Sequence, residues 1–72
     1  METLDLHNQR HRDVERLVED FLNWYDLPVK IITGNSNKMK QLVIDVVKRH
    51  KLYCHYENLR NSGCLIVTKQ DL

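Results

Sequence analysis

Hydrophobic residues follow two different periods along the chain, and each period predicts its own kind of element. Leucines alternate with polar residues in TLDLH, residues 3–7, which predicts a half-buried strand. Apolar side chains recur every three or four residues over 13–25 and again over 39–50, which predicts two amphipathic helices. Pro28 ends the first helical region, and Ser36 or Asn37 is the expected N-cap of the second helix.

The rest of the chain has the pattern of β-structure. VKIIT, residues 29–33, predicts a buried strand, and YCHYENL, residues 53–59, and CLIVTK, residues 64–69, predict a hairpin with a four-residue turn at 60–63. The order β-α-β-α-β-β predicts an α/β two-layer sandwich, with a mixed four-stranded sheet and two helices on one face. A right-handed crossover makes the first two strands parallel. We expect one domain over residues 1–72.

Length and composition narrow the class of protein. A chain of 72 residues and 8.7 kDa has room for one small domain. Two cysteines are too few for a secreted disulfide scaffold. No apolar run approaches the roughly 20 residues of a membrane span, and the first residues lack the apolar core of a signal peptide. The sequence therefore predicts a cytoplasmic domain with no membrane contact.

Charge is segregated along the chain although the net charge is only +1. Residues 1–29 contain three basic and seven acidic side chains, whereas residues 30–51 contain six basic side chains and a single acidic one. A basic middle segment in a nearly neutral chain indicates a localised surface for anions.

Polar residues follow the first two predicted strands at their carboxyl ends. Asp5 and His7 end the first strand, and Thr33, Gly34, Asn35 and Ser36 follow the second. Ligands of open α/β sheets bind beyond the carboxyl ends of the strands, so these groups are expected to converge. The alternative is structural, with Asp5 facing solvent on an open sheet face and His7 in a turn.

The Gly34 loop and the start of the second helix have the general form of a phosphate-binding turn. Lys38 and Lys40 lie in the first turn of that helix, where a cation opposes the helix dipole unless an anion is bound. Two exposed lysines that serve only solubility are the competing explanation. The spacing is not that of a nucleotide-hydrolysing P-loop.

The residues predict neither a metal site nor a cofactor. Cys54, His55 and Cys64 lack paired zinc-ligand spacing, and a hairpin centred on Asn61–Ser62 places Cys54 opposite Lys69, so no disulfide is expected.

The chain resembles the small MutS-related (Smr) domain family in two motifs, LDLH at Leu4–His7 and IITG at Ile31–Gly34. The separation of the two motifs and the order of the elements around them are similar to those of the family. The first family motif usually reads LDLHG and the second HGxG or TGxG. Asp5 and His7 correspond to the first, and Thr33, Gly34 and Asn35 to the TGx part of the second. This chain has Asn8 where the first motif has its glycine and Ser36 where the second ends in glycine.

The resemblance spans nearly the whole chain and implies a nucleic-acid-binding domain. Endonuclease activity occurs among family members, and the family sheet is related to that of the C-terminal domain of bacterial initiation factor three. We therefore expect an Smr-like domain that binds nucleic acid and is a candidate endonuclease. Two-metal cleavage of a phosphodiester needs several carboxylates, and only Asp5 is at the predicted site. For an endonuclease these residues therefore favour proton transfer by His7, with RNA as substrate because its 2′-hydroxyl supplies a nucleophile. The alternatives are a binding module without catalysis and a protein-interaction domain.

Overall fold

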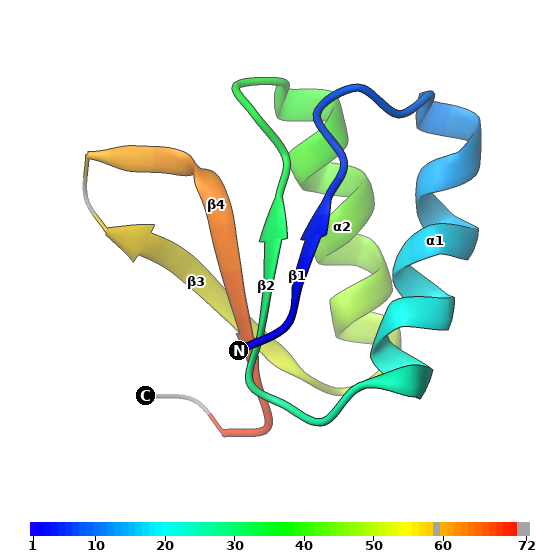
Figure 1. The fold of residues 1–72 in the computed structure, drawn as a ribbon, viewed down its shortest axis with the longest axis vertical. Helices are drawn as coiled ribbons and strands as arrows, with labels where there is room; N and C mark the ends of the chain where they lie inside the picture. The colour runs from blue at the N-terminus through cyan, green and yellow to red at the C-terminus, as the bar shows by residue number, and fades with distance from the viewer. Residues whose placement is uncertain (59, 71–72) are drawn as a thin grey trace.

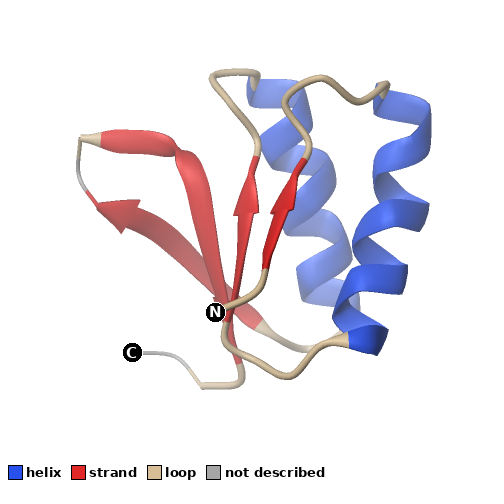
Figure 2. Ribbon diagram, viewed as in Figure 1, coloured by secondary structure: helices blue, strands red, loops and turns tan. Residues whose placement is uncertain are grey.

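The computed structural model describes residues 1–58 and 60–70. Its strands and helices follow one another along the chain in the predicted order. Both helices lie on the same side of the sheet, so the predicted mixed α/β architecture is confirmed (Figures 1 and 2). The elements are β1 (Thr3–Asp5), α1 (His11–Trp24), β2 (Val29–Ile32), α2 (Asn37–Arg49), β3 (Tyr53–Asn58) and β4 (Asn61–Thr68).

The sheet has the strand order β1-β2-β4-β3. β1 and β2 are parallel, with Asp5 opposite Ile32, as the right-handed crossover requires. β4 runs antiparallel to both of its neighbours, β2 and β3. Because β2 is central, the loop that follows it is flanked by the end of β1 on one side and by the start of β4 on the other.

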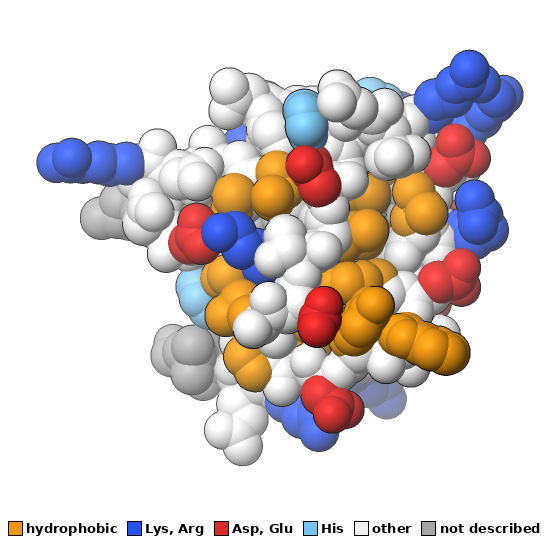
Figure 3. Space-filling view, in the orientation of Figure 1, with side chains coloured by type: hydrophobic (Ala, Val, Ile, Leu, Met, Phe, Trp, Pro, Cys, Tyr) orange, Lys and Arg blue, Asp and Glu red, His pale blue; other side chains and the backbone are white. Residues whose placement is uncertain are grey.

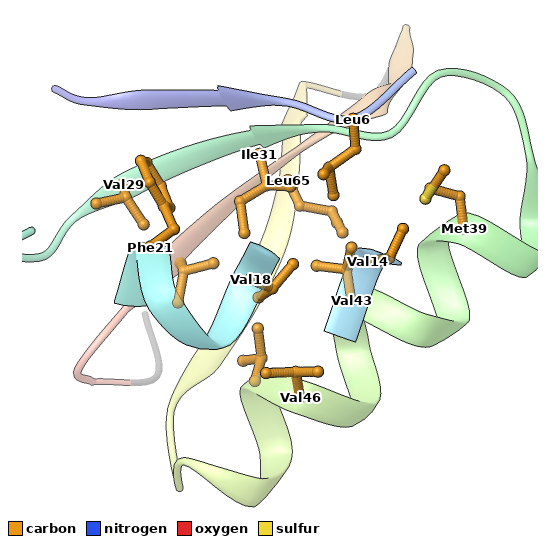
Figure 4. Close-up of a cluster of buried hydrophobic side chains, with 12 residues drawn as sticks. Leu6, Val14, Val18, Phe21, Val29, Ile31, Met39, Val43, Val46 and Leu65 are labelled. Atoms are coloured by element: carbon orange, nitrogen blue, oxygen red, sulfur yellow. The ribbon is translucent and has the colours of Figure 1, made fainter. Parts of the chain in front are cut away.

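The core lies between the sheet and the two helices (Figure 4). The apolar faces of both helices meet the inward-facing side chains of the strands, as the three-to-four-residue spacing predicts. Complete burial of a Val, Leu or Ile side chain contributes about 1.5–3 kcal/mol, so these contacts hold the two layers together. The core residues are Leu6, Val14, Val18, Phe21, Val29, Ile31, Met39, Val43, Val46, Val47, Leu65 and Val67.

Both helices begin close to their predicted positions. α1 starts at His11, two residues before the hydrophobic pattern begins, and its last turn is followed by the hydrogen bond from Tyr25 N to Phe21 O. Ser36 caps α2, because its Oγ accepts a hydrogen bond of 3.1 Å from the backbone N of Met39. Within the described residues, neither helix is long and apolar enough to cross a membrane.

β1 is shorter than predicted because Asp5 turns the chain. Its Oδ1 accepts a hydrogen bond from the backbone N of His7, and Gln9 N then donates to Leu6 O, which starts a turn. Leu6 N still donates to Ile32 O at 2.8 Å, so Leu6 remains beside β2 and is completely buried. His7 lies just beyond the strand instead of ending it.

The hairpin turn was predicted two residues too late. β4 already begins at Asn61, so the prediction of a turn at 60–63 was wrong. Asn58 Oδ1 accepts hydrogen bonds from the backbone N of both Arg60 and Asn61, which closes a tighter connection. Cys54 consequently pairs with Val67 instead of Lys69, and both cysteines are free, as expected. Residue 59, assigned to the third strand, lies outside the described residues.

Candidate active site

The loops that follow β1 and β2 lie side by side at one edge of the sheet (Figure 1). A Cβ atom built on Gly34 would be 3.4 Å from His7 Cβ, which is van der Waals contact. Figure 3 shows histidine side chains at the upper edge of the molecule, where these loops lie. The structure thus brings the Asp5–His7 segment and the Gly34 bend together.

A single carboxylate oxygen orients the His7 ring. Asp5 Oδ1 is 2.5 Å from His7 Nδ1 and also accepts the backbone N–H of His7 at 3.1 Å. In the neutral ring, an Nδ1–H donated to Asp5 leaves the lone pair on Nε2. Both side chains are half exposed, so Nε2 can reach a bound molecule. This is the arrangement in which a carboxylate fixes the tautomer of a histidine base.

The same contact changes the acidity of Asp5. The hydrogen bond from the His7 ring, followed by the bond from the His7 backbone N–H, lowers the pKa of the Asp5 carboxyl below its ordinary value of 3.8. Asp5 is therefore ionised at neutral pH and stabilises a proton on the facing ring nitrogen.

Thr33 and Gly34 build the loop and do not offer their donors to a ligand. The backbone N–H groups of both residues donate to Gly63 O, at 2.8 and 3.2 Å. The hydroxyl of Thr33 is buried and contacts Gly63 O and Gly34 O. The Gly34 amide thus has an acceptor within the protein, because β4 starts early enough to place the Gly63 carbonyl against this loop.

Gly34 has a left-handed backbone, with φ of +68°. A side chain would strain this conformation and would also approach His7 Cβ. Glycine is therefore required here by the bend that leads from β2 into α2, next to the histidine.

Backbone donors remain at the start of α2. Among the described residues, the N–H groups of Asn37 and Lys38 have no hydrogen-bond acceptor, as is usual in the first turn of a helix. The hydroxyl of Ser36 is used by the cap, and Asn35 is exposed in the loop. The N–H groups of Asn35 and Ser36 likewise have no acceptor among the described residues, so the donors left for an anion begin at the residue after the glycine.

Lys38 and Lys40 point to opposite sides of this helix end. Lys38 is exposed and lines a shallow groove of about 320 Å³ toward α1. Lys40 is only 8% exposed, and its Nζ lies 3.3 Å from Ser62 Oγ in the β3–β4 hairpin. The competing explanation, two exposed lysines that serve only solubility, is therefore wrong for Lys40.

Two further basic residues line the groove and were missed by sequence reasoning. His11 and Arg12, in the first turn of α1, lie with Lys38 along the groove, whose other lining residues are Glu15 and Leu42. Counting charge along the chain assigned Arg12 to the acidic first segment. The signal that could have found it is topological: α1 and α2 both follow parallel strands, so both helices begin at the same edge.

Among the described residues, no three His, Cys, Asp or Glu side chains lie close enough together to hold a metal ion. Comparisons with models of protein families, with curated proteins and with solved structures give no match. The interpretation of the site therefore depends on the geometry described above.

Proposed function

We propose that this chain binds nucleic acid at the edge formed by the β1–α1 and β2–α2 loops, and that it cleaves RNA there with His7 as the proton-transfer group. The observation that carries the proposal is the proximity of His7, oriented by Asp5, to the Gly34 bend at the start of α2, where a Cβ atom on Gly34 would be 3.4 Å from His7 Cβ. A base and a set of anion-binding donors then face the same bound phosphate. The resemblance to the Smr family supports the same conclusion.

The chemistry is an internal transfer within RNA. Nε2 of His7 accepts the proton of a 2′-hydroxyl, whose oxygen attacks the adjacent phosphorus. The bond from phosphorus to the 5′-oxygen breaks, and that oxygen takes a proton from solvent. The products are a 2′,3′-cyclic phosphate and a 5′-hydroxyl. Asp5 holds the ring in place and stabilises the imidazolium that forms.

The start of α2 stabilises the charge that develops on the phosphate. The N–H groups of Asn37 and Lys38 and the positive end of the helix dipole favour an anion, and the Lys38 ammonium adds a full charge. Removing one such donor from a phosphate or oxyanion site typically lowers the rate by about 10²–10³-fold.

Binding without cleavage is the second candidate, and the basic groove favours it. His11, Arg12 and Lys38 can contact phosphates whether or not His7 acts as a base. Such binding weakens as salt rises. RNA is present in the cytoplasm, the compartment that the sequence predicts, and is the proposed partner in both cases.

The test is a cleavage and filter-binding series with labelled single-stranded RNA, double-stranded RNA and branched DNA, in EDTA and in magnesium. We expect RNA products in both buffers, and we expect the His7→Ala variant to lose about 10²–10⁴-fold in rate while most of its binding remains. Equal cleavage by this variant removes His7 from the mechanism. Binding with no product in either buffer identifies a non-catalytic module, and absence of binding rejects the proposal.

A further inference from the structure

Lys40 is a buried cation with no carboxylate partner among the described residues. Its Nζ contacts the hydroxyl of Ser62 at 3.3 Å and lies 5.8 Å from the centre of the Tyr56 ring. A buried charge is unfavourable unless a counter-ion compensates it. A hydroxyl and an aromatic face compensate only part of the free-energy cost of burying this charge, so the position of Lys40 favours a bound anion.

The surroundings of Lys40 also favour an anion. Glu57, the nearest acidic residue along β3, forms an ion pair of 2.5 Å with Lys30 of β2. Arg60 is exposed at the outer end of the hairpin. The one acidic side chain of the hairpin is therefore already paired, while Arg60 adds a positive charge at the hairpin's outer end.

The hairpin lies on the other side of the Gly34 loop from His7. Ser62 precedes Gly63, whose carbonyl accepts the amides of Thr33 and Gly34. In the strand order β1-β2-β4, His7 follows β1 and Ser62 belongs to β4, two strand spacings or roughly 10 Å away. Figure 1 shows the outer end of the hairpin at the same end of the molecule as the β2–α2 loop.

We propose that Lys40, Ser62 and Tyr56 form a subsite for one nucleotide of single-stranded RNA, next to the cleavage site. Lys40 and Ser62 bind its phosphate, and the Tyr56 ring stacks on its base. This inference rests on the proposed function. A single strand is required because the bases of a duplex are stacked on one another and cannot lie on the ring.

Tyr56 has the exposure that stacking needs, and β3 provides a matched control. Tyr56 is 47% exposed, with Lys40 over one face of its ring. Tyr53, in the same strand, is 48% exposed but lines a groove with Ile44, Lys48 and Leu52, toward the other end of α2. Both tyrosines thus have a lysine in their surroundings, but among the described residues only Tyr56 has one over its ring, and the two differ in their distance from the Gly34 loop.

The experiment measures the affinity of the full chain for a single-stranded RNA and for the corresponding duplex. For Tyr56→Ala we expect single-stranded affinity to fall by about 5- to 150-fold, the range that base stacking on aromatic side chains supports, with duplex affinity within about twofold of wild type. Tyr56→Phe and Tyr53→Ala should bind the single strand like wild type. Lys40→Met keeps an apolar stem of similar length and should reduce the salt dependence by about 0.7 in log–log slope, one phosphate contact.

Equal affinities of Tyr56→Ala and Tyr53→Ala for the single strand overturn the subsite, as does an equal loss for single strand and duplex. If Lys40→Met fails to fold, as circular dichroism would show, the two tyrosine variants still decide. Wild-type protein that binds no nucleic acid overturns this inference and the proposed function together. Cleavage that survives His7→Ala, with binding that still depends on Tyr56, overturns only the catalytic part of the proposed function.

Discussion

Two histidine–carboxylate pairs occur among the described residues, and they have the same contact distance. His7 Nδ1 lies 2.5 Å from Asp5 Oδ1, and His50 Nε2 lies 2.5 Å from Glu19 Oε2. The first pair joins residues two positions apart at the end of a strand, and the second joins the C-cap of α2 to α1. Their chemistry is alike, so any difference in role must come from their surroundings.

The surroundings of the two pairs differ in exposure and in neighbours. The side chains of His7 and Asp5 are 52% and 51% exposed, against 23% and 32% for His50 and Glu19. Glu19 also contacts Arg49, 3.8 Å away, which in turn pairs with Glu15. The second pair belongs to an ion network that holds the two helices together.

Among the described residues, only the first pair lies beside donors without an acceptor. His7 lies next to the Gly34 bend, which leads to these amides at the start of α2, whereas His50 is at the opposite end of that helix. A positive charge on His50 is favourable at a helix C-terminus. We therefore propose catalysis for the pair at the Gly34 bend, while the pair of His50 and Glu19 joins the two helices.

Apart from the loss of His7 itself, the largest expected effect comes from the carboxylate of the first pair. Asp5→Asn removes the charge that stabilises the imidazolium and that selects the His7 tautomer, so we expect RNA cleavage to slow by about 10–100-fold. Single-turnover cleavage rates at saturating protein measure the effect. A rate for Asp5→Asn equal to that of wild type would show that the ring does not need its partner.

A moderate effect is expected from the carboxylate of the second pair, and on stability alone. Glu19→Gln loses the contacts to His50 and Arg49, which should lower the free energy of unfolding by about 1 kcal/mol, because these partly exposed pairs are screened by solvent. Urea denaturation at neutral pH measures this loss. The cleavage rate under folding conditions should stay the same, and a drop comparable to that of Asp5→Asn would remove the distinction between the pairs.

A smaller effect is expected from the basic groove beside the first pair. Arg12→Ala should weaken RNA binding by about two- to fivefold at low salt and reduce the log–log salt dependence by about 0.7, the value for one phosphate contact. Arg16→Ala, also exposed on α1 but outside the groove lining, is the matched control. Identical salt dependence of the two variants would argue against phosphate contacts in the groove.

The smallest expected effect is a change in the pKa of the Asp5 carboxyl. Since the hydrogen bond from His7 lowers the pKa of Asp5 below 3.8, the stabilisation from this contact is fully present above pH 3.8 and is lost as the pH falls through the lowered pKa. NMR of the Asp5 carboxyl carbon should give a midpoint below 3.8 in wild type, and a midpoint nearer 3.8 in His7→Ala. A wild-type midpoint at or above 3.8 would mean that the contact does not persist in solution.

Sequence patterns predicted the architecture well because they depend on burial. The helical periods of Val14–Phe21 and Met39–Val47 place the apolar residues of each helix on a single face, which packs on the core. With the element order β-α-β-α-β-β, few arrangements of the four strands bury both of these faces against one sheet. The end of β1 and the hairpin turn were misplaced because single side chains, Asp5 and Asn58, accept backbone N–H groups there. Such local hydrogen bonds compete with the sheet and leave no periodic signal.

The candidate site was predicted less completely. The proximity of His7 to the Gly34 bend followed from the parallel pairing of β1 and β2, but the direction of each donor did not. Gly34 donates inward because Gly63 is opposite, and Lys40 turns toward Ser62. Both contacts depend on the register of β4 against its neighbours. The sequence analysis predicted this register with an error of two residues, since Cys54 pairs with Val67 and not with Lys69. Tertiary neighbours, and not residue types, decide which donors remain free.

The most direct test compares His7→Ala with His50→Ala, measuring single-turnover RNA cleavage and the free energy of unfolding for both. We predict opposite losses: His7→Ala cleaves about 10²–10⁴-fold more slowly and unfolds within about 0.5 kcal/mol of wild type, while His50→Ala cleaves at the wild-type rate and is less stable by about 1 kcal/mol. Wild-type cleavage by His7→Ala, or equal losses of rate in the two variants, would contradict the assignment of catalysis to the pair at the Gly34 bend.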